Sequence, residues 1–373
     1  MTGVQTCALP ISRISALFSH SKTALAPAIN DFFAAVQDVA NNPGATPERR
    51  VLLGKGVALA DRFVHLDARL RDFARETNGR IEGAVRDINS LVHKLGKLNE
   101  QIVRASATGA PPNDLFDARD QALNRLSEIV DVSTVRQSNG AVNVFIGKGQ
   151  ALLVGSAVSA LSAFTNPDNP DETNVGLAQS GSIERLLSGG ALGGALSFRR
   201  EVLDKARSQL GLIAEGLSRS VNDQHKLGLD LDDSLGRDFF TTAPPAVSAR
   251  GNNTGTGVVS GRIDDLAALT GDRYTLAFDG ANYTLTNNTT GASQTGRGPN
   301  FRVDGVAIAV AGAPAAGDAF VIAPTQNAAR SIRVAIDDPR QIAAASPLRS
   351  APDRKSTRLN SSHRSLSRMP SSA

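Results

Sequence analysis

Apolar residues recur every seven positions in two separate stretches of the chain, which is the spacing of helices that pack along one side. In residues 81–102 there are two such series of apolar residues, and each member of the second lies three positions after a member of the first. Residues 192–224 contain a shorter pair of series with the same spacing. Burying one leucine or isoleucine side chain is worth about 1.5–3 kcal/mol, so we expect the two helices to pack on each other. The predicted helix-packing seam consists of Ile81, Ala84, Ile88, Leu91, Leu95, Leu98, Ile102, Leu196, Leu203, Ala206, Leu210, Ile213 and Leu217.

The helical pattern extends beyond the first of these stretches. It is present in residues 13–42, stops at Asn41-Asn42-Pro43, restarts at Thr46-Pro47 and continues to about Arg104. Glycines inside this long helix weaken it by about 1 kcal/mol each relative to alanine. They are Gly79, Gly83 and Gly96.

Alternation with a period of two replaces the helical pattern on either side of Asn139-Gly140, which predicts a β-hairpin. The run Leu152-Leu153-Val154 is able to extend this hairpin by a third strand. Residues 165–182 are rich in Asn, Pro, Asp, Ser and Gly, and therefore indicate an exposed loop.

The composition of the chain changes near residue 240. No glutamate follows Glu215, no lysine lies between Lys226 and Lys355, and glycine, threonine and asparagine become frequent. Short alternating runs around the turn Asp279-Gly280 predict a small all-β domain there.

These patterns together predict an α+β fold, with long coiled-coil-like helices forming a rod, a small β-hairpin element and a separate all-β outer domain. The predicted divisions are a first part of the helical rod (13–107), a short helix plus β-hairpin (108–165), a loop (166–188), the return helix of the rod (189–239), the β-rich outer domain (240–326) and a return segment (327–352).

Composition and charge exclude several classes of protein. Hydrophobic residues make up 41% of the 373 residues, which excludes a wholly disordered chain, and no apolar run is long enough to cross a membrane as a helix. Aromatic residues are only 4%, so few rings are available to stack on nucleotides. The last 21 residues account for the whole net charge of +4, which argues against a nucleic-acid-binding surface.

Both ends of the chain differ from the rest of the sequence. The opening MTGVQTCALPI and the closing RKSTRLNSSH resemble translated library-adapter sequence, so we predict that 1–12 is a non-native leader and 353–373 a non-native tail. A genuine disordered tail is the alternative. Cys7, the single cysteine, lies in this leader, so the chain has no intrachain disulfide.

The sequence contains no convincing catalytic, cofactor-binding or metal-binding site. The glycine-rich run 189–194 precedes a helix, but it lacks the preceding strand and the lysine of a phosphate-binding loop. Asp230, Asp232 and Asp233 lie near His225, but they lack the glycine and closing glutamate of a calcium loop. We therefore interpret these residues as a turn into a helix and a solvated acidic turn, and we predict that the protein is not an enzyme.

Several stretches, in order along residues 14–350, resemble the flagellar hook-associated protein 1 family. They are APAINDFFAAVQDVANNP (26–43), RIEGAVRDINSLVHKLGKLNEQI (80–102), PPNDLFDARDQALNRLSEIVDV (111–132), NVFIGKGQALLVG (143–155), GGALGGALSFRREVLDKARSQLG (189–211), NDQHKLGLDL (222–231), YTLAFDGANYTLT, FRVDGVAIAV and AAGDAFVIAPTQNAARSIRVAIDDPRQIAAAS.

The resemblance implies a structural subunit at the junction between hook and filament of the bacterial flagellum. It implies extracellular location after export without a cleaved signal peptide, and self-association in a helical assembly. The implied partners are the hook protein, the second hook-associated protein and an export chaperone. The family's terminal helices, expected before residue 14 and after 350, are missing, so we expect this chain to assemble less well than the intact protein.

Two other functions remain open at this point. One is an extracellular surface-binding module, in which the β domain recognises a glycan or a host protein and the helices form a stalk. The Asn- and Thr-rich loops at 252–256 and 287–295 suggest it. The other is a different flagellar axial protein.

Overall fold

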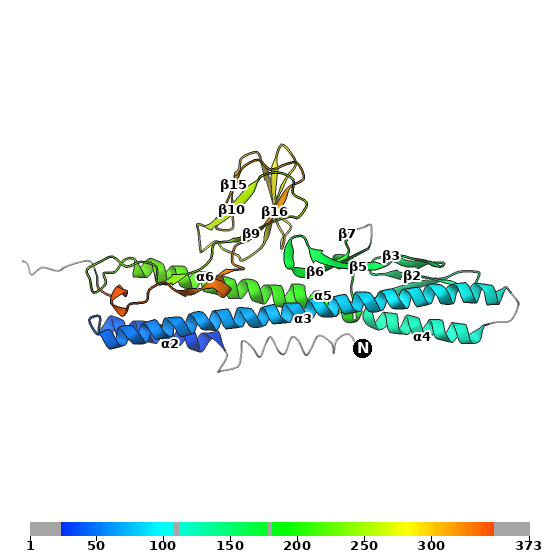
Figure 1. Cartoon of the computed structure of the whole chain (residues 1–373), viewed down its shortest axis with the longest axis horizontal. Coiled ribbons are helices and arrows are strands. Elements are labelled where there is room, and N and C mark those ends of the chain that lie inside the picture. Colours follow the sequence, from blue (N-terminus) through cyan, green and yellow to red (C-terminus); the bar gives the residue numbers. More distant parts are fainter. Residues whose placement is uncertain (1–23, 108–111, 178–180, 347–373) are drawn as a thin grey trace, which may run out of the picture.

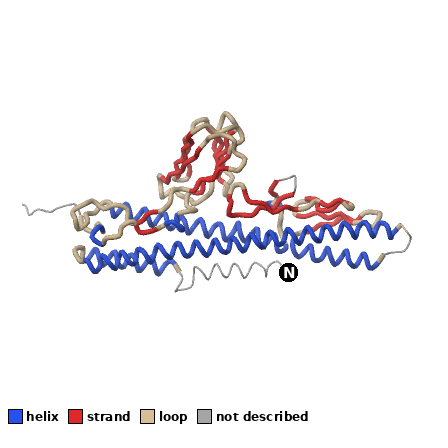
Figure 2. The backbone as a smooth tube through the Cα atoms, viewed as in Figure 1, coloured by secondary structure: helices blue, strands red, loops and turns tan. Residues whose placement is uncertain are grey.

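The computed structural model describes residues 24–107, 112–177 and 181–346, and they form a long helical rod with a β domain projecting from its side (Figure 1). Figure 2 shows that helices run the length of the rod, whereas strands lie along one side of it and in the projection. The predicted α+β class, with long helices and a separate β region, is confirmed. The predicted leader, tail and Cys7 lie outside the described residues.

The rod is built around one helix, α3, whose 61 residues span about 90 Å at the usual rise per residue. Helix α2 precedes it, α4 follows it, and α5 and α6 return along it. A short π-helical turn, η2, joins α5 to α6 without interrupting the helical path. The bounds are α2 (Leu25–Asn41), α3 (Thr46–Ser106), α4 (Asn113–Ile129), α5 (Gly190–Phe198), η2 (Arg199–Leu203) and α6 (Asp204–His225).

Two hydrophobic cores lie one after the other along α3. The first contains the buried residues of α3 between Leu52 and Ala74, together with side chains of α2 and α6. The second contains the buried residues of α3 between Ile81 and Leu95, together with side chains of α4, α5 and the neighbouring strands. Because α3 contributes to both cores, damage to this helix affects the whole rod.

Two small antiparallel sheets pack on the second half of α3. The first sheet has the order β1-β2-β3-β4, with the predicted turn at Asn139-Gly140, where Gly140 has a φ of 85°. The second has the order β5-β6-β7. The bounds are β1 (Val132–Arg136), β2 (Val142–Ile146), β3 (Gln150–Val154), β4 (Ala157–Val158), β5 (Leu161–Asn166), β6 (Asn169–Leu177), β7 (Gly181–Ser182) and the 3-10 turn η1 (Glu184–Leu186).

The prediction that residues 166–188 form a loop is wrong. Residues 161–177 form a hairpin in which β6 carries the buried side chains of Glu172, Asn174 and Val175. The Asn, Pro and Asp residues that suggested a loop form the tight turn of this hairpin and polar contacts on both sides of it. Local composition alone does not reveal this hairpin, because the α3 side chains that hold it on the rod, Asn78 and Asn89, are distant in sequence.

The projecting β domain consists of two antiparallel sheets around a third hydrophobic core. One sheet has the order β13-β12-β11-β16-β9 and the other β10-β15-β14, and the inward side chains of both follow the alternation seen in the sequence. The bounds are β9 (Ala246–Ala249), β10 (Val258–Ile263), β11 (Tyr274–Phe278), β12 (Tyr283–Asn287), β13 (Ser293–Gly296), β14 (Asn300–Val303), β15 (Val306–Ala311) and β16 (Ala319–Ala323).

The chain passes from the rod to the β domain and back through two neighbouring segments. These pair as a two-stranded sheet, formed by β8 (Phe240–Thr241) and β17 (Arg333–Val334). Between β16 and β17 lies the short helix α7 (Ala328–Ser331), and the 3-10 turn η3 (Pro339–Gln341) follows β17. The described chain then ends against the rod at Ser346.

We expect Gly79→Ala to raise the free energy of unfolding by about 0.5–1 kcal/mol, because alanine loses less backbone entropy in a helix. Gly79 is exposed within α3, and a Cβ atom placed there meets nothing within 4 Å. Gly56→Ala in the same helix is the control, since its Cβ lies 2.9 Å from the ring of Phe239. In urea denaturation, the free energy of unfolding must rise for Gly79→Ala and fall for Gly56→Ala if this explanation is correct.

Candidate functional site

The seam predicted in residues 81–102 is buried along one of its two series. Ile81, Ile88, Leu95 and Ile102 are at most 1% exposed. In the second series Leu98 is buried, whereas Ala84 and Leu91 are only partly buried at the edge of the second core. The fully buried residues lie instead one position later, at Val85, Val92 and Asn99.

This shift has a geometric cause. At about 100° per residue, a position four residues further along a straight helix lies about 40° from the first, whereas a position three residues further lies about 60° away. The +4 series is therefore nearer the centre of the buried face. Asn99 satisfies its burial by bonding the backbone of the first sheet, donating to the carbonyl oxygens of Val142 and Gly155 and accepting from the Val142 N–H.

The second half of the predicted seam follows the same rule. Leu196, Leu203 and Leu210 are buried, whereas Ala206 and Leu217 are partly buried. The prediction that Ile213 is buried in the seam is wrong: it is 46% exposed, and Ala214 is buried in its place.

The two halves of the seam lie side by side over only a short distance. Leu196 shares the second core with Ile81 and Ile88, but Leu203 and Leu210 belong to the first core. Beyond Ile88, the buried face of α3 packs mainly on α4 and the two small sheets. The apolar face of α3 is therefore covered by a different set of elements in each half of the rod.

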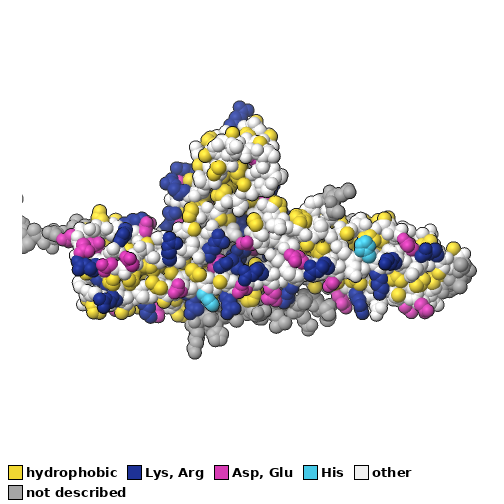
Figure 3. Space-filling model, viewed as in Figure 1, with side chains coloured by type: hydrophobic (Ala, Val, Ile, Leu, Met, Phe, Trp, Pro, Cys, Tyr) yellow, Lys and Arg dark blue, Asp and Glu magenta, His cyan; other side chains and the backbone are white. Residues whose placement is uncertain are grey.

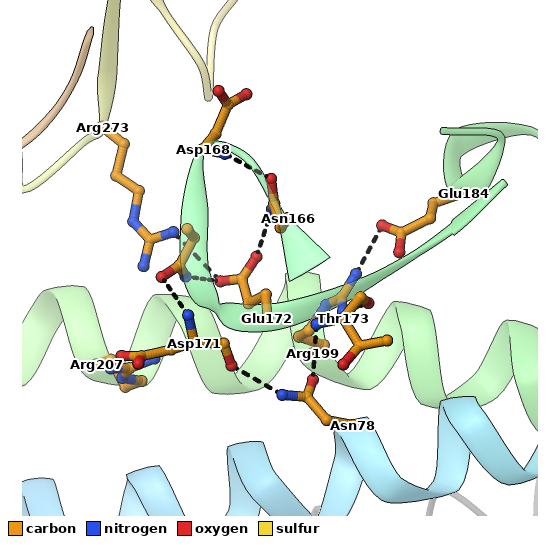
Figure 4. A network of polar contacts seen from close by, with 11 residues as sticks. Asn78, Asn166, Asp168, Asp171, Glu172, Thr173, Glu184, Arg199, Arg207 and Arg273 are labelled. Atoms are coloured by element: carbon orange, nitrogen blue, oxygen red, sulfur yellow. Dashed lines mark hydrogen bonds and ion pairs between the residues drawn. The ribbon is translucent and has the colours of Figure 1, made fainter. Parts of the chain in front are cut away.

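A polar network forms where the β5–β6 hairpin crosses the rod (Figure 4). Asn78 of α3 donates to the carbonyl oxygen of Asp171 at 2.8 Å and accepts from the N–H of Thr173 at 3.3 Å. About three helical turns further along α3, Asn89 donates to the carbonyl oxygen of Leu161 at 2.9 Å and accepts from the N–H of Leu161 at 2.8 Å. Each asparagine thus pairs with a strand as another strand would.

The return helix holds the same hairpin from the other side. Arg199 is buried, and it donates to the carbonyl oxygen of Thr173 at 2.7 Å and to the carboxylate of Glu184 at 2.6 Å. Arg207, also buried, lies 3.7 Å from the carboxylate of Asp171. Arg199 interrupts the apolar pattern of the helix because it binds the hairpin and not the core.

The tip of the hairpin contacts the β domain. Arg250, which follows β9, forms two hydrogen bonds of 2.6 and 3.0 Å with the carboxylate of Asp168. Arg273, which precedes β11, donates to Glu172 at 3.2 Å, and the second oxygen of this buried carboxylate accepts from Asn166 at 3.0 Å. We name the contacts of Asp168, Glu172, Arg250 and Arg273 the domain junction. They connect the rod to the projecting domain independently of the covalent connections.

Asp204 lies at the start of α6 within this charged cluster. Burial, reinforced by the nearby carboxylate of Glu172, raises the pKa of Asp204 to about 6. Arg273, Arg199 and Arg207 oppose this shift but do not cancel it. Since the folded chain binds this proton more tightly than the unfolded chain does, Asp204 favours folding most at acidic pH.

We therefore expect the contribution of Asp204 to stability to increase by about 2 kcal/mol or less as the pH falls from about 7 to about 4. Asp204→Asn removes the titrating carboxyl group. The free energy of unfolding of the wild type, relative to that of the variant, must therefore rise as the pH falls over that interval. Urea denaturation of both proteins at several pH values measures the difference. A difference independent of pH contradicts the assignment.

The residues considered for catalysis or metal binding have structural roles in the described part of the chain. The glycine run 189–194 lets α5 begin against the end of α4, where Gly189 and Gly190 have φ values of 65° and 57°. His225 bonds two backbone groups, and Asp232 pairs with Arg340. Among residues 24–107, 112–177 and 181–346, no three His, Cys, Asp or Glu side chains are grouped to hold a metal ion.

None of the described helices combines the length and apolar character needed to cross a bilayer.

Comparison with known families matches both parts of this architecture. Residues 11–240 match the family described as flagellar hook-associated protein FlgK helical domain. Residues 248–324 match the family described as flagellar hook-associated protein 1, D2-like domain. The boundary between the two matches coincides with the passage from rod to β domain.

The chain is also similar to individual proteins whose names indicate the same family. The chain is 33% identical to flagellar hook-associated protein 1 of Escherichia coli over 90% of its own length and 63% of that protein. It is 31% identical to the Salmonella typhimurium protein of the same name, over 94% and 66% of the two chains. The flagellar hook junction protein FlgK of Burkholderia pseudomallei superposes with a TM-score of 0.84 at 34% identity, over 93% and 65%.

This chain spans slightly less than two thirds of the length of those relatives. Within that span, the ordered matches to a helical domain and then a D2-like domain follow the rod and the β domain described above. The chain belongs to the flagellar hook-associated protein 1 family.

Proposed function

We propose that this chain is a structural, non-enzymatic subunit of the bacterial flagellum at the hook–filament junction. The observation that carries the proposal is the family match along nearly the whole chain, combined with a rod of about 90 Å whose projecting domain is fastened by ion pairs. In such a subunit the rod would supply a stiff element along the tube, and the ion pairs would hold the second domain at a set angle to the rod.

The described cores support this mechanical role. Both halves of α3 are packed along the rod, so bending the rod requires disturbing two hydrophobic cores. The domain junction adds hydrogen bonds between domains that are far apart in sequence. We propose that copies of the chain associate side by side through the rod, with the β domain directed outward.

The proposed partners follow from the family. They are other copies of the chain, the hook protein on one side and the second hook-associated protein on the other, with an export chaperone before assembly. The proposed location is extracellular, after export without cleavage of a signal peptide.

Co-sedimentation with purified hooks tests this proposal. The chain, and a version extended to the full length of its relatives, are incubated with hooks and centrifuged. We expect the extended version to bind hook ends, to pellet together with the hooks, and to promote addition of the second hook-associated protein. If neither version binds hook ends or filament ends, the proposed function is wrong.

The domain junction allows a matched comparison. Asp168→Asn removes the charge opposite Arg250, whereas Asp279→Asn removes a charge at an exposed turn of the β domain. If a fixed angle between rod and β domain matters for assembly, Asp168→Asn lowers co-sedimentation of the extended version more than Asp279→Asn does. The ion pair is one-third exposed, so its effect on overall stability is expected to be below about 1 kcal/mol.

A further inference from the structure

The last described residues of the chain form a strap across one end of the rod. We define the strap as residues 339–345. Leu229, in the loop after α6, pairs with it through three backbone hydrogen bonds of 2.8 to 3.2 Å, and buried Arg49 of α3 donates to the carbonyl oxygens of Pro339 and Ile342. The strap forms one wall of an apolar groove of about 540 Å³, opposite α2 residues including Phe33.

One side chain joins this strap directly to α6. His225, the last residue of α6, is 7% exposed and uses both of its ring nitrogens. Nδ1 lies 2.6 Å from the carbonyl oxygen of Arg237, and Nε2 lies 2.8 Å from the backbone nitrogen of Ala343. A carbonyl oxygen only accepts and a backbone N–H only donates, so the ring carries its proton on Nδ1 and accepts at Nε2.

This arrangement accommodates only the neutral ring. A protonated imidazole carries a hydrogen on each nitrogen, so a second proton at Nε2 would face the N–H of Ala343 across 2.8 Å. The hydrogen bond to the strap is then lost, and a charge is placed in a buried site. The bond to Arg237 is compatible with both forms and does not distinguish them.

The charged groups around the ring do not compensate for its burial. Burial lowers the pKa of His225, and the bond to the Arg237 carbonyl and the charges of Asp230 and Asp238 oppose this only in part. The Arg237 guanidinium adds to the lowering.

The other described elements at this end of the rod contribute further charged and aromatic groups. α3 contributes the buried Arg49, Arg340 of the strap pairs with Asp232, and Phe239 lies edge-on to the imidazole at 5.7 Å. From α2 the groove is lined by apolar side chains, including Phe32 and Val39.

We propose that His225 is a pH-sensitive latch, which holds the strap on the rod end when neutral and weakens that attachment when protonated. Because the folded state disfavours the charged ring, the stabilisation is present above the ordinary histidine pKa of 6.5 and is lost as the pH falls below it. Loosening the strap also removes one wall of the groove. Acid thereby exposes apolar side chains at this end of the rod.

Hydrogen–deuterium exchange of the whole 373-residue chain tests the latch. Protection of the peptide covering the strap is measured at about pH 7.5 and about pH 5 and corrected for the intrinsic exchange rate at each pH. The ring binds a proton more weakly when the strap is attached than when it is released, so acid favours the released strap. We therefore expect the protection of the strap amides to fall on the order of tenfold between about pH 7.5 and about pH 5. Peptides from the middle of α3 are expected to keep their protection.

His225→Gln is the matched variant, because a glutamine side chain has a donor group (NH₂) and an acceptor group (C=O) but does not titrate in this range. We expect its strap to exchange equally at both pH values after correction. His93→Gln, at an exposed position of α3, must behave like the wild type. The latch is refuted if the wild-type strap is equally protected at both pH values, or if His225→Gln shows the same acid-dependent loss.

A second measurement does not depend on any variant. The ¹⁵N NMR signals of the wild-type ring at neutral pH report which nitrogen carries the proton. We expect Nδ1 to be protonated and Nε2 to be free, and we expect the amide signal of Ala343 to shift with the titration of that ring. A ring protonated at Nε2 at neutral pH contradicts the latch.

Discussion

Leu95→Asp is expected to lower the free energy of unfolding by at least about 4 kcal/mol. Leu95 is 1% exposed and lies in the second core, between α3 and the elements that cover it. The substitution removes the buried leucine side chain and places a carboxylate in a core formed by hydrophobic side chains. Since α3 contributes to both cores, we expect one cooperative transition at a lower temperature.

Ser90→Asp is the matched control, because it introduces the same carboxylate on the exposed face of the same helix. We expect it to change stability by no more than about 0.5 kcal/mol. Circular dichroism at 222 nm during heating compares the two variants with the wild type. An unchanged melting temperature for Leu95→Asp means that this face of α3 is not buried in solution.

The sequence predicts the helices of the rod and the hairpins at Asn139-Gly140 and Asp279-Gly280 well, because their signals are local. The heptad-like spacing of Ile81, Ile88 and Leu95 defines one face of α3 whatever covers that face. The turn at Asn139-Gly140 requires a positive φ that glycine adopts without strain, so the hairpin around it is also a local property.

The identity of the packing partner is not local, and there the sequence prediction is less accurate. Two helices with similar leucine spacing suggest packing on each other, yet residues 85–102 pack mainly on α4 and two sheets. Those sheets are also apolar on one face, and periodicity does not rank the available partners. The error at Ile213 has a different origin: Ala214, four residues after Leu210, lies nearer the centre of the buried face than Ile213 does.

The domain junction was missed because its residues are polar and scattered along the chain. Asp168 and Glu172 lie in a segment whose composition indicates a loop, and their partners Arg250 and Arg273 are 82 and 101 residues away. One signal was present in the sequence. Arg199 occupies an apolar position in the leucine pattern of the return helix, and an arginine at such a position needs a buried partner.

Gly190→Ala is expected to lower the free energy of unfolding by about 3 kcal/mol or more. Gly190 begins α5 with a φ of 57°, a left-handed conformation that costs an alanine about 1–2 kcal/mol. A Cβ atom there lies only 2.3 Å from the carbonyl carbon of Ile129 and 2.5 Å from the nitrogen of Val130. Both contacts are with backbone, so α5 must move away from the end of α4, which disturbs the second core around Leu192.

Gly155→Ala separates the two contributions, because Gly155 has a similar φ of 62° and no atom within 4 Å of the added Cβ. We expect this variant to lose only the conformational part, about 1–2 kcal/mol, in urea denaturation. Equal losses in the two variants mean that α5 does not approach α4 as closely as described. A larger loss for Gly190→Ala ties the glycine run to helix packing, since an anion-binding loop exposed to solvent has room for a methyl group at this position.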